Sequence, residues 1–187
     1  MAKKAIVLLA DGFEDVEAVT PIDYLQRAGI EVTTTSISDS LTVTSKWGGI
    51  KMTAASTLAE VTKHGITGYD AIILPGGMPG TANLAASKET GALIKDMAAN
   101  GKLICAICAA PALVLAPLGL LKGKKFTCYP NMEEKVTDGK WSDDRVVTDG
   151  NVITSRGAGT AGEFAVTIIE KLLDKAAAQK LAETVLL

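Results

Sequence analysis

The sequence predicts an α/β fold, in which a mostly parallel sheet is covered by helices on both faces. Segments with a strand pattern alternate with segments with a helix pattern through the 187 residues. The strand segments are mostly continuous apolar runs, which is typical of strands buried on both sides. Because no linker, repeat or low-complexity stretch interrupts this alternation, we predict a single domain over residues 1–187.

Each element is predicted from a local pattern. Apolar or β-branched runs predict strands over residues 4–10, 30–37, 70–74 and 102–107, with short ones near Phe126, Val146 and Val152. Residues 41–45 and 50–53 flank the turn sequence KWGG and predict a hairpin. Apolar spacing predicts helices over residues 15–28, 89–99, 109–115, 161–173 and 175–185. In the first helix this spacing comes from Val16, Val19, Ile22 and Leu25, and Pro21 predicts a kink or break.

The composition narrows the classes of partner and compartment. Basic and acidic residues are interspersed and nearly balanced, with a net charge of −2, which argues against nucleic acid or an anionic membrane as the main partner. No apolar run reaches the length of a membrane-spanning helix, and the N-terminus leads directly into a strand. Three cysteines make neither a disulfide framework nor a zinc site. We therefore expect a cytoplasmic protein with free thiols.

A ligand site is expected beyond the carboxyl ends of the parallel strands. Three segments meet there by this rule: residues 11–17, the glycine-rich loop 75–80, and the strand-to-helix turn at Cys108. Free N–H groups at a helix start favour negative charge, so we expect a lowered pKa and a nucleophilic thiolate at Cys108. The alternative is a core cysteine, which fits the mid-strand Cys105 better.

The other two segments supply possible partners for the thiol. Glu14 and Asp15 suit the first helical turn as complements of the helix dipole, whereas Glu17 lies one turn further. Glu17 is either part of the helix surface or a confined, protonated carboxyl that donates to the thiolate and moves a proton. Gly76 and Gly77 form either a plain turn or, with the N–H of Ala109, an oxyanion hole.

The remaining candidates are weaker. His64 is the sole histidine and is expected on the surface, which disfavours a Cys-His pair and a metal site. No nucleotide-binding glycine motif follows a strand. Tyr129 is expected either to line the pocket or to pack against Pro130. Arg156 is expected to bind an anion or an interface carboxylate, or to form a structural ion pair.

Five segments resemble the ThiJ/PfpI superfamily, in the branch that includes the parkinsonism-associated protein deglycase. They are LADGFEDVEAV at residues 9–19, RAGI at 27–30, LPGG at 74–77, AICAAP at 106–111 and ITSRGAGT at 153–160. The resemblance implies a flavodoxin-like three-layer sandwich, a homodimer, and no metal or organic cofactor. It also assigns Cys108 as the reactive cysteine, Glu17 as its partner, and the amides of Gly77 and Ala109 as the oxyanion hole.

The chain departs from this family at three positions. Tyr129 stands where many relatives have a histidine, so proton transfer would rest on Glu17. Ala109 stands where the protease-like branch has a histidine, which argues against peptidase activity. Thr53 replaces a peripheral cysteine, which argues against disulfide sensing there.

Two functions are therefore expected of the same residues. The first is a glutathione-independent glyoxalase or deglycase that converts small α-oxoaldehydes, or their early adducts, to 2-hydroxy acids in protection against carbonyl and oxidative stress. The second is a redox sensor or chaperone in which Cys108 is oxidised to a sulfinic acid.

Overall fold

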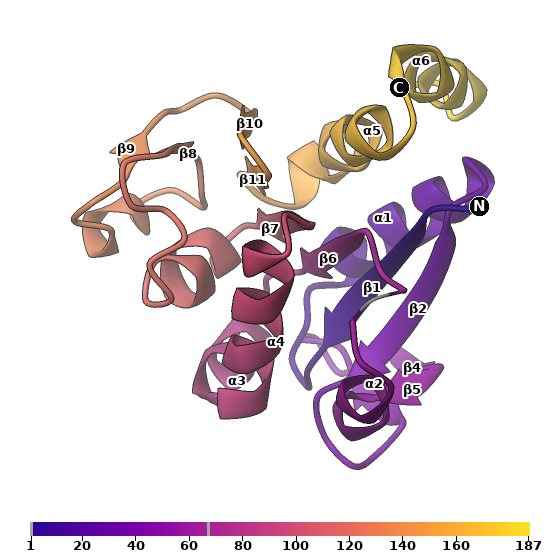
Figure 1. Cartoon of the computed structure of the whole chain (residues 1–187), viewed down its shortest axis with the longest axis vertical. Helices are drawn as coiled ribbons and strands as arrows, with labels where there is room; N and C mark the ends of the chain where they lie inside the picture. Colours follow the sequence, from indigo (N-terminus) through magenta and orange to yellow (C-terminus); the bar gives the residue numbers. More distant parts are fainter. Residues whose placement is uncertain (1, 67) are drawn as a thin grey trace.

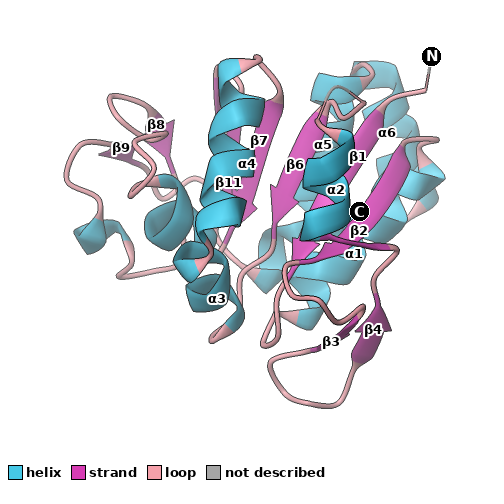
Figure 2. Ribbon diagram, turned by 60° about the horizontal axis from the view of Figure 1, so that its bottom comes forward, coloured by secondary structure: helices cyan, strands magenta, loops and turns pink. Residues whose placement is uncertain are grey.

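A computed structural model describes residues 2–66 and 68–187; Met1 and Thr67 lie outside the description. Its main sheet has seven strands in the order β10-β11-β7-β6-β1-β2-β5, with only β10 antiparallel to its neighbour (Figure 2). The bounds are β1 (Lys4–Leu9), β2 (Glu31–Ser36), β5 (Ser56–Thr57), β6 (Ala71–Leu74), β7 (Leu103–Ile107), β10 (Val146–Asp149) and β11 (Val152–Ser155). The mostly parallel sheet is confirmed.

Helices cover both faces of this sheet, which gives the expected flavodoxin-like three-layer sandwich (Figure 1). One face carries α1 (Asp15–Arg27), α5 (Ala161–Leu172) and α6 (Lys175–Thr184). The other carries α2 (Leu58–His64), α3 (Gly80–Ala86), α4 (Lys88–Ala99) and the π-helical η1 (Pro111–Leu115). Alternate side chains of β1 enter opposite cores, because Val7 packs towards the first set and Ile6 and Leu8 towards the second.

Two small pairs of strands lie outside the main sheet. The predicted hairpin is confirmed as β3 (Thr42–Thr44) paired antiparallel with β4 (Lys51–Thr53). A second pair joins β8 (Lys125–Phe126) to β9 (Lys140–Trp141) in parallel. Two short 3-10 turns complete the elements, η2 (Glu133–Lys135) and η3 (Ala158–Thr160).

The structure differs from the local expectations in α1 and in the type of one later helix. α1 runs through Pro21 without a break, although a proline at this position removes the hydrogen bond that a backbone N–H would donate to the carbonyl of Glu17. Its buried face holds Ala18, Pro21 and Leu25, whereas Val16 and Val19 are 46% and 42% exposed. The helix expected over residues 109–115 is confirmed, and it is π-helical over Pro111–Leu115.

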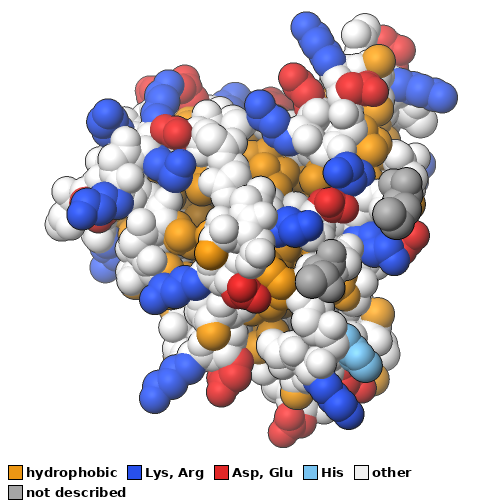
Figure 3. Space-filling model, in the orientation of Figure 1, with side chains coloured by type: hydrophobic (Ala, Val, Ile, Leu, Met, Phe, Trp, Pro, Cys, Tyr) orange, Lys and Arg blue, Asp and Glu red, His pale blue; other side chains and the backbone are white. Residues whose placement is uncertain are grey.

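The surface agrees with the balanced charge of the sequence. Basic and acidic side chains are interspersed over the face shown in Figure 3. Within the described residues, no helix is both long and apolar enough to cross a bilayer.

Candidate active site

Cys108 directly follows β7 and has a left-handed backbone conformation, with φ 65°. Its N–H donates to the carbonyl of Ser155 at 2.9 Å, and its carbonyl accepts from the N–H of Tyr129 at 2.8 Å. Residues other than glycine rarely occupy this region, and such strain is concentrated at functional sites. The neighbouring segments thus hold the turn that projects the thiol beyond the sheet.

The three segments predicted to converge on the site do so. Glu17 extends from α1 to the β6–α3 loop, where its Oε2 accepts the N–H of Gly76 at 2.9 Å. The same carboxyl neighbours the Cys108 thiol, because a Cβ on Gly76 would lie 2.5 Å from Glu17 Oε2 and 3.0 Å from the Cys108 sulfur. The N–H groups of Gly77 and Ala109 act on this sulfur and lower the pKa of the thiol. One thiol, one carboxyl and two amides therefore form a single cluster.

Glycine is required at positions 76 and 77 by space and by backbone conformation. A Cβ on Gly76 would lie 2.5 Å from both Cys108 Cβ and Glu17 Oε2, closer than real Cβ atoms come to other atoms. Gly77 has φ 92°, and a Cβ there would lie 2.5 Å from the carbonyl oxygen of Gly12. The two glycines let the loop backbone reach the sulfur and the carboxyl.

Glu14 fixes the start of α1. Its side chain caps the helix by accepting the N–H of Glu17 at 2.8 Å, and its own N–H donates to the carbonyl of Gly76 at 3.0 Å. The dipole-complementing role expected for an acidic residue here is thus accompanied by a capping hydrogen bond. The cap fixes the helix turn that carries the carboxyl, and the backbone hydrogen bond joins this turn to the loop that carries the amides.

The protonation of Glu17 and Cys108 is coupled. Burial, which leaves the Glu17 side chain 1% exposed, raises the pKa of its carboxyl to about 7, against the opposing hydrogen bonds of Cys108 and Gly76. Burial and the charge of Glu17 raise the pKa of the Cys108 thiol to about 12, while the amides of Gly77 and Ala109 lower it. The expected lowering of the thiol pKa by the helix start is therefore wrong for a thiol beside a charged Glu17.

A single proton nevertheless connects the two groups. Once the pair has lost one proton, the remaining proton lies either on the sulfur or on the neighbouring carboxyl. When it is on Glu17, the repulsion from the carboxylate disappears and the two amides stabilise the thiolate. The pair thus offers a thiolate next to a neutral carboxyl without requiring a low pKa for the isolated thiol.

Residues of the cluster line a pocket of about 270 Å³. Tyr129 and the hairpin residues Lys46 and Trp47 line it, together with Glu14, Glu17, Gly77, Met78, Cys108, Ala109, Met132 and Ala158. The ammonium of Lys46 lies 4.6 Å from the centroid of the Trp47 ring. Sequence reasoning missed Lys46 and Trp47. A bridge between Phe13 and Ser45 brings them to the pocket, and no local sequence pattern predicts this pairing.

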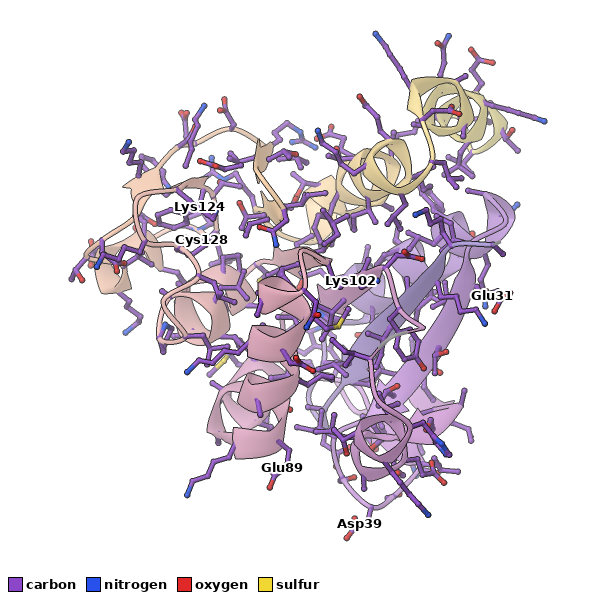
Figure 4. All side chains as sticks on the ribbon, in the orientation of Figure 1. Glu31, Asp39, Glu89, Lys102, Lys124 and Cys128 are labelled. Carbon is purple, nitrogen blue, oxygen red and sulfur yellow. The ribbon has the colours of Figure 1, made fainter. Side chains whose placement is uncertain are left out.

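The other candidate residues lie outside this cluster. His64 is exposed near the end of α2, whereas Cys105 and Cys128 are buried, the latter in the segment after β8 (Figure 4). Arg156 donates to the carbonyl of Asp143 at 2.9 Å and, within the described part of the chain, forms no ion pair. No group of three His, Cys, Asp or Glu side chains that could hold a metal ion occurs among the described residues.

The chain is similar to known proteins over almost its whole length. It is 42% identical over 181 residues to Protein DJ-1 homolog B of Arabidopsis thaliana, covering 97% of this chain but only 40% of that protein. It therefore spans less than half the length of this plant relative. It is 37% identical over 173 residues to glutathione-independent glyoxalase DJR-1.2 of Caenorhabditis elegans, covering 91% and 89% of the two chains.

The fold and a family profile agree with these relatives. The crystal structure of DJ-1beta from Drosophila melanogaster superposes with a TM-score of 0.93 at 39% identity, covering 100% of this chain and 99% of that chain. The profile of the DJ-1/PfpI family matches residues 3–171. The chain belongs to the DJ-1/PfpI family.

Proposed function

We propose that this protein is a cysteine-dependent glyoxalase or deglycase that converts α-oxoaldehydes, or their early adducts, to 2-hydroxy acids without glutathione. The observation that carries the proposal is the Cys108 sulfur, which lies next to the buried Glu17 carboxyl and shares one pocket with Gly77 and Ala109. A nucleophile, a proton carrier and an oxyanion hole are the groups that this reaction needs. The glyoxalase name of the Caenorhabditis elegans relative supports the same reaction class.

The first step is addition to the aldehyde. The Cys108 thiolate forms a C–S bond to the aldehyde carbon, and the electron pair of the carbonyl moves to oxygen. The N–H groups of Gly77 and Ala109, which lower the pKa of the thiol, stabilise the developing alkoxide. Glu17 gives its proton to that oxygen, which leaves a hemithioacetal and a carboxylate.

The second step is an internal redox reaction. The Glu17 carboxylate removes the proton from the former aldehyde carbon, which gives an enediolate, and returns it to the adjacent carbon. The remaining hydroxyl proton moves between the two oxygens, so a 2-hydroxy thioester forms on Cys108. One carbon is oxidised while its neighbour is reduced, so no external oxidant, reductant or cofactor is required. Water then releases the 2-hydroxy acid and restores the thiol.

The test is lactate formation from methylglyoxal in the absence of glutathione. We expect lactate from the wild type, none above background from Cys108→Ser, and a decrease of about 10²-fold or more for Glu17→Gln. Cys105→Ala is the matched control, because it removes a buried thiol three residues away that does not line the pocket. Lactate production by folded Cys108→Ser at the wild-type rate would refute the mechanism.

A second candidate function is redox sensing through oxidation of Cys108 to a sulfinic acid. Of the three cysteines, Cys105 and Cys128 are buried and only Cys108 is partly exposed, so it is the accessible thiol. Intact mass after mild peroxide treatment should show two added oxygens in the wild type and none in Cys108→Ser. Equal oxidation of both proteins would exclude a selective sensor.

We also propose that the chain acts as one domain in a cytoplasmic homodimer. Val16 and Val19 on α1 and Trp47 and Ile50 in the hairpin are all more than 40% exposed. The N–H of Lys46 donates to the carbonyl of Phe13 at 2.7 Å, which joins the hairpin to the start of α1. An apolar surface of this kind is suited to a second copy of the chain. Three unpaired cysteines suit the reducing cytoplasm.

A further inference from the structure

A second cavity, of about 510 Å³, adjoins the Cys108 pocket. Tyr129 and Ala158 line both cavities. The remaining walls come from Pro130, Arg145, Arg156, Gly157, Gly159 and Thr160. A substrate group attached to the carbon at Cys108 can therefore extend past Tyr129 into this space.

The two arginines of this cavity differ in what they bind. Arg145 is engaged by the carboxylate of Glu163, at 2.8 and 2.9 Å from its Nε, and donates from Nη2 to the carbonyl of Gly159 at 2.7 Å. Arg156 is half-buried and donates from Nη1 to the carbonyl of Asp143, but it has no carboxylate partner among residues 2–66 and 68–187. A guanidinium has five N–H donors, so Arg156 retains unused donors and an uncompensated charge at the cavity wall.

Gly157 separates the cavity from the catalytic carboxyl. Its φ of 168° is extended backbone that any residue adopts, so the backbone does not require glycine here. A Cβ at this position would lie 3.7 Å from Glu17 Oε1 and 3.6 Å from Tyr129 Cδ2. Any side chain would therefore start to fill the space between the carboxyl and Tyr129, which glycine leaves open.

We propose that Arg156 forms a subsite for a carboxylate carried by the substrate whose carbonyl reacts at Cys108. This inference rests on the proposed function and specifies its substrate class, namely α-oxoaldehydes and adducts that bear a carboxylate, such as those formed on an amino acid or a peptide C-terminus. The planar guanidinium matches a carboxylate in two-point geometry. A carboxylate suits the cavity better than a phosphate dianion, because Glu163 already neutralises the second arginine.

The first experiment compares kcat/KM for 4-carboxyphenylglyoxal with kcat/KM for neutral 4-methylphenylglyoxal. We expect the ratio of the two values to fall about tenfold or more in Arg156→Gln and to recover partly in Arg156→Lys. Lys171→Gln is the matched control for loss of one positive charge, since Lys171 lies at the opposite end of α5 from the cavity, and it should keep the wild-type ratio. An unchanged ratio in Arg156→Gln would overturn the proposal.

The second experiment does not depend on turnover. Intact mass follows the labelling of Cys108 by N-(4-carboxyphenyl)maleimide and by N-phenylmaleimide, and we expect the preference for the charged reagent to decrease in Arg156→Gln. If this preference depends on Arg156 while no glyoxal is converted, the proposed function fails and the subsite stands. If glyoxals are converted but neither ratio depends on Arg156, the subsite alone fails.

A third variant locates the carboxylate. Lys46 lines the Cys108 pocket itself and is a further cation that a substrate carboxylate could reach. We expect Arg156→Gln to lower both the kcat/KM ratio of the two glyoxals and the labelling ratio of the two maleimides more than Lys46→Gln does. A loss of selectivity in Lys46→Gln alone would place the carboxylate in the first pocket and overturn the assignment to Arg156.

Discussion

Gly76 determines how closely the thiol and the carboxyl of the active site approach each other. Gly76→Ala should lower kcat/KM by more than tenfold and destabilise the protein by about 1–3 kcal/mol, because its methyl group would overlap Cys108 Cβ and Glu17 Oε2. Steady-state kinetics and urea denaturation measure the two effects. Gly49→Ala, where a Cβ meets nothing within 4 Å, is the control, and equal behaviour of the two variants would contradict the packing seen at Gly76.

The activity should depend on the proton shared by Glu17 and Cys108. Since the pKa of Glu17 is raised to about 7, the reactive form with one proton missing accumulates as the pH rises through that value. We expect kcat/KM to increase between about pH 6 and pH 8 and then to level off. In Glu17→Gln the residual kcat/KM should not rise between pH 6 and pH 8. A rise of the same size in that variant would show that another group causes it.

The same carboxyl should make stability depend on pH. Its pKa is higher in the folded protein, at about 7, than its ordinary value of 4.5, so the unfolded chain releases the proton first as the pH rises. The protonated Glu17 carboxyl therefore adds about 3 kcal/mol to the free energy of unfolding. This contribution is complete below about pH 4.5 and is lost by about pH 7. Urea denaturation of wild type and Glu17→Gln at pH 5 and pH 8 should show the wild type losing stability relative to the variant. A constant difference would mean that the folded and unfolded pKa values are equal.

At the scale of single elements, the start of α1 connects stability to the site. Glu14→Ala removes the cap on the Glu17 N–H, which should cost about 1 kcal/mol and lower kcat/KM because the turn that carries the carboxyl is less well fixed. Thr57→Ala removes the cap of α2 and is the matched control, expected to lose similar stability with no loss of kcat/KM. Thermal denaturation and kinetics should therefore separate the two variants; equal kinetics would show that the Glu14 cap is not needed for the site.

The sequence predicted the buried elements best. β1, β6 and β7 are fully apolar or nearly so, and their pattern is independent of what covers them. The prediction of the buried face of α1 was wrong, because the apolar Val16 and Val19 are exposed whereas the polar Glu17 is buried. Helical spacing cannot recognise a carboxyl that is buried to meet a thiol.

Short elements and contacts between distant segments were the hardest to predict. α2 and α3 have only seven residues each, too few to establish an apolar repeat, although the Thr57–Glu60 capping box marks the first of them. The meeting of the Cys108 turn with the loops at residues 11–17 and 75–80 was predictable, because parallel strands bring their carboxyl ends together. The role of Glu17 in this cluster came from the family resemblance. The pocket walls at Lys46 and Trp47 were not predictable, since hairpin placement depends on tertiary pairing.

At the scale of the whole molecule, the exposed side chains of α1 and the hairpin predict self-association. We expect sedimentation at twice the mass of the chain, and Val19→Glu should shift the protein towards the monomer because it places a charge in the apolar surface. Leu173→Glu is the control, since Leu173 is exposed to a similar extent, 39% against 42%, just beyond α5. A monomeric wild type, or equal effects of both variants, would refute this interface.

The left-handed backbone of Cys108 has a consequence for which proteins can descend from this one. A residue other than glycine at φ 65° costs the fold free energy whether or not it reacts, so the thiol is retained at the expense of stability. A lineage released from the need for this chemistry would gain stability by placing glycine or asparagine at the turn. Loss of the cysteine in a descendant with the same strands would therefore indicate a change of function rather than a failure of folding.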